Sequence, residues 1–118
     1  MTCVERTRQS LAAAESEGKR LGAFITLMHD RAMKRAEELD SELKAGRSRG
    51  PLHGTPLAVK DLFYTAGVRT TGGTKIFADF VPDRDAAVVT SLENAGAVII
   101  GKTNLHELAY GITSNNPH

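Results

Sequence analysis

The sequence has one cysteine, Cys3, among its 118 residues, so it cannot form a disulfide within the chain. Its first residues, Met-Thr-Cys-Val-Glu-Arg, lack the apolar core that is typical of a secretory signal peptide. Both features favour a reducing, cytoplasmic location. No apolar run approaches the roughly 20 residues that cross a bilayer, so we expect no membrane contact.

An excess of charge of one sign is also missing. The chain has 15 basic and 14 acidic residues, which gives no basic surface of the kind that binds nucleic acid. The histidines His53, His106 and His118 do not stand at metal-ligand spacing with Glu107 or Asp61, and no H-x-x-x-H pair occurs. We therefore expect no metal, no cofactor and no direct contact with nucleic acid.

The first part of the chain is predicted to be helical. Apolar residues recur at three- and four-residue spacing over residues 28–43, with charged residues between them, which predicts an amphipathic helix of about 16 residues. A second, weaker helix is predicted over residues 4–17. Residues 45–50 form a basic, glycine-containing linker that ends at Pro51. The pattern thus predicts a helical lead-in over residues 1–46.

The pattern after the linker is strand, long loop, helix and strand. We predict strands at 57–60 and 97–100 and, between them, a helix that Asp83 caps and that runs to Ala95. Gly96 would end this helix in the left-handed conformation. The predicted inward positions of the helix are Val88, Val89, Leu92 and Ala95. Two strands that flank a helix favour a right-handed βαβ unit in which they run parallel.

A short helix is predicted next, with Asn104 as its cap, Glu107 at its third position and Gly111 at its end. In open parallel sheets, sites form beyond the carboxyl ends of the strands. Lys60 and residues 101–111 both follow such ends, so this edge of the sheet is where we expect the functional site.

Lys60 is the strongest candidate for a catalytic residue in the sequence. It follows Leu57, Ala58 and Val59, an apolar run typical of a buried strand. A lysine at the end of a buried strand must find a partner or lose its proton, and a neutral lysine is a base. The neighbouring Asp61 should point to the opposite face of the strand. Taken alone, however, a lysine in this position is more often one that only reaches out to solvent.

Several other patterns favour structural roles. Residues 96–103 match the phosphate-loop pattern G-x-x-x-x-G-K-[ST], but their apolar, β-branched middle should itself be a strand. Lys102 is therefore interpreted as a salt-bridging or loop-anchoring residue. Residues 70–73, Thr-Thr-Gly-Gly, could form an anion-binding nest, but a loop that covers the sheet is the preferred interpretation. His53 is interpreted as a structural hydrogen-bonding residue.

Three blocks of the sequence resemble the amidase signature family: GPLHGTPLAVKD at 50–61, TAGVRTTGG at 65–73 and the long block 79–118. They occur in the family's order and spacing, and the similarity extends over about residues 21–118. The resemblance implies a layered α/β/α fold with a mixed, largely parallel sheet. It also implies a Ser–cis-Ser–Lys triad, in which the catalytic base maps onto Lys60.

The resemblance implies further site residues as well. In the family, the stretch equivalent to Ala109, Tyr110 and Gly111 borders the acyl pocket through main-chain atoms. Whether the Tyr110 side chain faces the substrate or the core stays open. The resemblance implies a small-molecule amide as the substrate. It leaves the oligomeric state open, and an oligomer is possible.

The chain also departs from the family, because no run of the GGSSGGS kind is present. Its serines are isolated residues and poor candidates for a nucleophile; they are Ser10, Ser16, Ser41, Ser48, Ser91 and Ser114. We therefore expect residues 1–118 to be the N-terminal part of an amidase domain, a lead-in over 1–46 and a βαβ segment over 47–118, with no second domain. Alone, this part should be inactive and marginally folded.

The sequence thus predicts an amidase that hydrolyses a carboxamide C–N bond and to which this chain supplies the lysine. One alternative within the same chemistry is the A subunit of a tRNA-dependent amidotransferase, which would work with partner subunits. The ending YGITSNN is more typical of the general amidases, since the A subunits more often have MGSSTEN. A second alternative, from another class, is a non-catalytic remnant or a partner-binding module.

Overall fold

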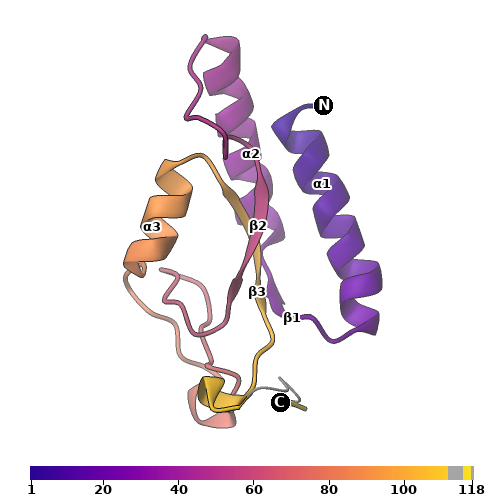
Figure 1. Ribbon diagram of the computed structural model, residues 1–118, viewed down its shortest axis with the longest axis vertical. Helices are drawn as coiled ribbons and strands as arrows, with labels where there is room; N and C mark the ends of the chain where they lie inside the picture. Colours follow the sequence, from indigo (N-terminus) through magenta and orange to yellow (C-terminus); the bar gives the residue numbers. More distant parts are fainter. Residues whose placement is uncertain (112–115, 118) are drawn as a thin grey trace.

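The computed structural model describes residues 1–111, 116 and 117. Its main elements are helix α1 (Cys3–Ala13), strand β1 (Phe24–Leu27), helix α2 (His29–Lys44), strand β2 (Pro56–Lys60), helix α3 (Ala87–Asn94) and strand β3 (Val98–Thr103). A π-helical turn, Ala14–Gly18, extends α1, and 3-10 turns lie at Lys75–Phe77 and Glu107–Ala109. Figure 1 shows these elements in chain order.

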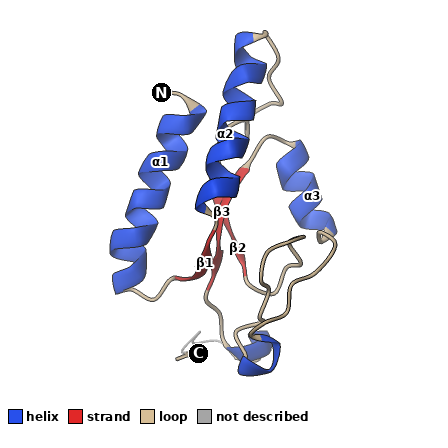
Figure 2. Ribbon diagram, turned by 180° about the vertical axis from the view of Figure 1, so that it is seen from behind, coloured by secondary structure: helices blue, strands red, loops and turns tan. Residues whose placement is uncertain are grey.

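The three strands form one mixed sheet in the order β1-β3-β2. Strand β3 is central; it pairs antiparallel with β1 and parallel with β2. The helices α1 and α2 lie on one side of the sheet and α3 on the other, as Figures 1 and 2 both show. The predicted α/β class, with helical layers around a mixed sheet, is confirmed. The strands that precede and follow α3 in the sequence, β2 and β3, run parallel as predicted.

The core follows the alternation of side chains along β3. Val98 and Ile100 point to one face, where they join buried residues of α1 and α2 such as Leu11 and Leu39. Ile99 points to the other face and packs with Val89 of α3. The apolar first half of β3, residues 98–100, is thus buried on both faces, which is typical of a central strand.

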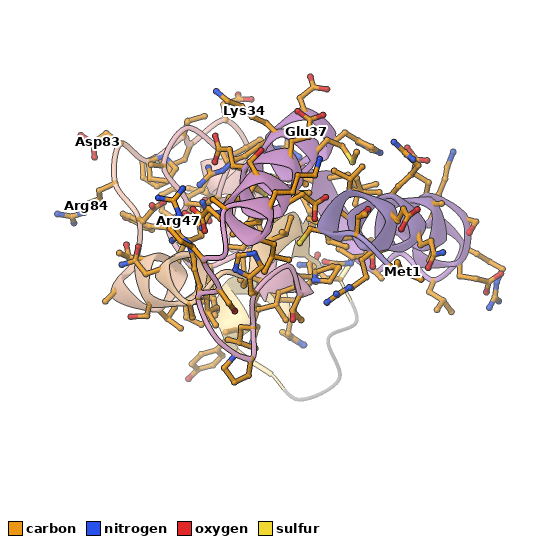
Figure 3. All side chains as sticks on the ribbon, turned by 90° about the horizontal axis from the view of Figure 1, so that it is seen from above. Met1, Lys34, Glu37, Arg47, Asp83 and Arg84 are labelled. Carbon is orange, nitrogen blue, oxygen red and sulfur yellow. The ribbon has the colours of Figure 1, made fainter. Side chains whose placement is uncertain are left out.

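The two helices of the lead-in form as predicted. Helix α2 buries Ala32, Ala36 and Leu39, which recur at helical spacing, and Figure 3 shows Lys34 and Glu37 on its outer side. Helix α1 begins with a capping box between Thr2 and Glu5. Its first turn also receives help from α2, because the Asp40 carboxylate accepts hydrogen bonds from the Cys3 and Val4 amides at 2.8 and 3.0 Å.

Several details of the sequence prediction are wrong. The lead-in is not purely helical, because it contains β1, which pairs with β3. Helix α3 begins at Ala87 rather than after Asp83, and Val88 is exposed rather than inward. Gly96 does adopt the expected left-handed conformation, with φ of 95°. Figure 3 shows Asp83 in the outer loop beside Arg84.

The expectation of a buried strand before Lys60 is also wrong. Strand β2 lies at an edge of the three-stranded sheet, and of its residues only Val59 is buried. Lys60 and Ala58 are exposed, whereas Asp61, the next residue, is fully buried. The alternation between Lys60 and Asp61 is therefore as predicted, but the strand is covered on one side only.

Candidate active site

The carboxyl ends of β2 and β3 lie side by side. Lys60, the last residue of β2, stands opposite Thr103, the last residue of β3, and the Asp61 amide donates to the Thr103 carbonyl at 3.1 Å. In Figure 1 the loops that follow both strands gather at this end of the sheet. The prediction that Lys60 and residues 101–111 meet at one edge is confirmed, and this edge has the position of a site in an open α/β sheet.

The Lys60 side chain is exposed in this structure, without a partner among the described residues. Its Nζ forms no ion pair or hydrogen bond with them. Its main chain, in contrast, is fixed, because the Lys60 carbonyl accepts from the Phe63 amide at 3.1 Å. The strand end thus presents an exposed lysine, unpaired within the described part of the chain, from a hydrogen-bonded backbone position.

The buried lysine at this edge is Lys102, not Lys60. Lys102 belongs to the central strand β3 and its side chain is completely buried. Its Nζ donates to the Phe63 carbonyl and to Thr70 Oγ1, both at 2.9 Å. It also lies 3.2 Å from Asp61 Oδ1, a contact that is electrostatic because the two groups lack hydrogen-bond alignment. The interpretation of Lys102 as a salt-bridging, loop-anchoring residue is confirmed.

Burial sets the acid–base behaviour of Lys102. Loss of hydration lowers the pKa of Lys102 below the ordinary lysine value, and the Asp61 carboxylate opposes this effect. A buried lysine needs acceptors for its donors and a balancing charge. Here the Phe63 carbonyl and the Thr70 hydroxyl accept its hydrogen bonds, and the Asp61 carboxylate balances its charge. Lys102 is therefore interpreted as a structural residue, because its side chain is completely buried and hydrogen-bonded.

The loop over residues 70–73 is anchored on Asp61. Asp61 Oδ2 accepts from the Thr71 amide at 3.0 Å and from its hydroxyl at 2.5 Å, and the Thr71 hydroxyl in turn accepts from the Gly73 amide. The Gly72 amide donates to the Asp61 carbonyl at 2.7 Å. The anion held by this loop is thus the protein's own carboxylate. The preferred interpretation, a loop that covers the end of the sheet, is confirmed.

The segment with the predicted substrate contacts passes over this loop. The Leu108 amide donates to the Gly72 carbonyl at 2.7 Å, which places residues 107–110 beside the Asp61-anchored loop. Leu108 and Ala109 adopt positive φ angles of 52° and 60°, uncommon for residues with a side chain. Tyr110 is 91% exposed, so of the two alternatives left open for its side chain, the core position is wrong. Ala109 and Gly111 are also exposed.

The predicted helix at Asn104 is reduced to a single turn. Asn104 Oδ1 accepts from the Leu105 amide, and the 3-10 turn that follows spans only Glu107–Ala109. His106, rather than Asn104, is its N-terminal flanking residue. The positive φ of Leu108 is the physical reason, because a left-handed residue cannot continue a right-handed helix.

The other sequence patterns take the structural roles expected of them. Residues 98–103 of the phosphate-loop match are strand β3, so they do not wrap a phosphate. His53 is buried; its Nδ1 accepts from the Arg49 amide at 3.1 Å and its Nε2 lies 2.9 Å from the Leu39 carbonyl. Within the described ranges no group of three or more His, Cys, Asp or Glu residues could hold a metal ion. Ser114 and His118 lie outside the described residues.

Comparison with known proteins identifies the family. The family model described as "Amidase" matches residues 5–118, nearly the whole chain. The chain belongs to the amidase family. The match begins before the blocks that carry the resemblance in the sequence, so the lead-in with α1 and β1 is part of the family's pattern as well.

Curated relatives and solved structures agree with this assignment. The A subunit of the glutamyl-tRNA(Gln) amidotransferase of Heliobacterium modesticaldum is 50% identical over 97 residues, which cover 82% of this chain and 20% of the relative. Its counterpart in Rhodospirillum rubrum is 48% identical, over 93% of this chain and 22% of the relative. The native peptide amidase of Stenotrophomonas maltophilia superposes with a TM-score of 0.85 at 42% identity, covering 91% of this chain and 22% of that one.

The chain spans about a fifth to a quarter of the length of the curated relatives that it matches, between 20% and 24%. The described part of the chain contains no helix that is long and apolar enough to cross a membrane. The sequence pattern placed Lys60 and residues 101–111 at one edge of the sheet and made Lys102 a salt-bridging residue, but it did not identify Asp61 as the partner of Lys102. The signal that could have revealed this ion pair is the position of Lys102 directly after a β-branched run. A lysine buried in such a strand needs a buried carboxylate as its partner.

Proposed function

We propose that this segment supplies the base of an amidase, with Lys60 as that base. The observation that carries the proposal is an exposed Lys60, unpaired among the described residues, at the paired carboxyl ends of two parallel strands in a chain of the amidase family. Lys60 stands in the family's lysine block, GPLHGTPLAVKD, and its position on the described surface leaves it accessible to a reaction partner.

The proposed reaction is the hydrolysis of a carboxamide C–N bond. A serine hydroxyl attacks the carbonyl carbon, and its proton passes through a cis-serine to neutral Lys60. The C–N bond then breaks, the amine or ammonia leaves with a proton, and water hydrolyses the acyl-enzyme. The two serines correspond to no residue of this sequence, so the activity is proposed for a protein that joins this segment to a Gly/Ser-rich block.

The substrate side of the proposal involves the segment over residues 109–111. Ala109, Tyr110 and Gly111 are exposed beside the Asp61-anchored loop, and we assign to their main chain the border of the acyl pocket. The proposed substrate is a small amide, with no metal or cofactor and no membrane or nucleic acid partner. A single amidase domain and a cytoplasmic location belong to the same proposal.

A second candidate is the A subunit of a glutamyl-tRNA(Gln) amidotransferase. The observation that favours it is the run of curated relatives with that name, 39–50% identical to this chain. Such a protein would release ammonia from glutamine and would work with partner subunits. Glutamine hydrolysis that needs a second subunit would favour this candidate, whereas turnover of simple amides by the isolated protein would favour the amidase.

The test of the proposed function is made in the full-length chain that carries this segment. Lys60→Ala should lower kcat on the best amide of a substrate panel by about 10²–10⁴-fold, the usual contribution of a general base. Lys75→Ala, a second exposed lysine outside the strand ends, serves as the matched control and should keep the parent kcat. Equal activity of the Lys60→Ala and Lys75→Ala proteins would overturn the proposal.

A further inference from the structure

The turn that follows Lys60 is held by a chain of contacts that leads to Lys102. The Lys60 carbonyl accepts from the Phe63 amide at 3.1 Å, and the Phe63 carbonyl accepts from Lys102 Nζ at 2.9 Å. Lys102 therefore fixes the far end of a four-residue turn whose near end is the proposed base. Because Lys102 lies in the central strand, this turn is attached to the buried middle of the sheet.

Asp61 fixes the same turn from within. Its side chain is completely buried and holds both Lys102 and the Thr71 amide and hydroxyl. Its main-chain carbonyl accepts from the Gly72 amide. One carboxylate thus joins the end of β2, the end of β3 and the loop over residues 70–73, on the face opposite to Lys60.

We propose that Asp61 and Lys102 are positioning residues for the amidase reaction, which act by fixing the direction in which Lys60 leaves strand β2. The inference rests on the proposed function of Lys60. Neither residue touches a substrate, because both side chains are fully buried, so their effect passes through the Lys60 main chain. A displacement of a catalytic group by about 1 Å can cost about 10²-fold in rate, which sets the scale of the expected effect.

The test is a comparison in two backgrounds of the full-length chain. Asp61→Asn should lower kcat by about 10- to 100-fold when Lys60 is present, with KM changed less than about threefold. In the Lys60→Ala background the same substitution should change kcat by less than about threefold, because a positioning residue has nothing left to position. A purely structural role would give the same loss in both backgrounds.

The control for general destabilisation is Asp40→Asn. Asp40 is also a carboxylate that fixes another element, the first turn of α1, and it takes no part in the contacts around Lys60. This variant should lower the melting temperature while the folded protein keeps the parent kcat. All rates are compared per mole of folded protein, measured by circular dichroism.

A second variant keeps the inference testable if Asp61→Asn does not fold. Asp61→Asn combined with Lys102→Met removes both buried charges, and replacing a buried ion pair as a whole is often neutral for stability. The double variant should fold and show the same loss of kcat, again only when Lys60 is present. A folded double variant with the parent kcat would overturn the positioning role.

The outcomes also separate this inference from the proposed function. If Lys60→Ala lowers kcat but Asp61→Asn costs the same in both backgrounds, only the positioning role fails. If Lys60→Ala keeps the parent kcat, the proposed function fails and the inference fails with it.

Discussion

The buried ion pair between Asp61 and Lys102 gives a sharp prediction for stability. Both side chains are 0% exposed, so water does not screen their interaction. Removal of one partner leaves the other as an uncompensated buried charge, which costs about 3–5 kcal/mol in the free energy of unfolding. Lys102→Met also leaves the Phe63 carbonyl and the Thr70 hydroxyl without their donor, so its cost should lie at the upper end of that range.

Urea unfolding of the full-length chain measures this cost. With a urea dependence of about 1–3 kcal/mol per molar, a loss of about 3 kcal/mol lowers the unfolding midpoint by about 1–3 M. The variant that lacks both charges should cost no more than either single variant, because it buries no lone charge. As a control, Glu17→Gln breaks the ion pair with Arg20, whose side chains are 66% and 68% exposed, and should leave the midpoint unchanged.

Additive losses in the double variant would refute the reasoning. They would mean that Asp61 and Lys102 contribute separately, through their hydrogen bonds to the loop, and not as a pair. A loss of stability in Glu17→Gln as large as that in Lys102→Met would likewise show that burial does not set the strength of these contacts.

Three further outcomes follow from the structure. Hydrogen bonds from Arg49 lower the pKa of Glu42 to about 2 from an ordinary value of 4.5, so its stabilising contribution is present above pH 4.5 and is lost as the pH falls toward 2. Glu42→Gln should therefore weaken the fall of the unfolding midpoint between pH 5 and pH 3, and an unchanged pH dependence would contradict this. Burial raises the pKa of Cys3 to about 11. Iodoacetamide at pH 8 should therefore label Cys3 slowly in the native protein and much faster in urea. Rapid labelling of the native protein would contradict the fold around α1. Because Lys102 is buried in strand β3, ATP and GTP should not raise the melting temperature, and saturable nucleotide binding that Lys102→Met abolishes would disprove this.

Helices and the central strand could be predicted from the sequence because their signals are local. Helix α2 has a clear apolar stripe, and β3 is a β-branched run between a helix and a turn. Strand β1 could not be found in this way. It has only four residues, all half-buried, and its partner strand lies more than 70 residues further along the chain. Its existence depends on that distant pairing and not on its own pattern.

The position of Lys60 was predictable, but its surroundings were not. The apolar run before it suggested burial, whereas the order of strands places β2 at an edge of the sheet. The order of strands is a tertiary property that no local pattern encodes. The same holds for Asp61 and Lys102, which are 41 residues apart in the sequence and meet because β2 and β3 pair in parallel.

The most direct test of Lys60 as the base is the kcat of Lys60→Arg in the full-length chain, measured beside Lys60→Ala. Arginine keeps the charge and most of the length of lysine, but it stays protonated at any working pH and cannot accept a proton. If Lys60 is the base, Lys60→Arg should be as impaired as Lys60→Ala, with a kcat about 10²-fold or more below that of the parent. A Lys60→Arg protein nearly as active as the parent would show that Lys60 serves as a structural cation and would contradict its assignment as the base.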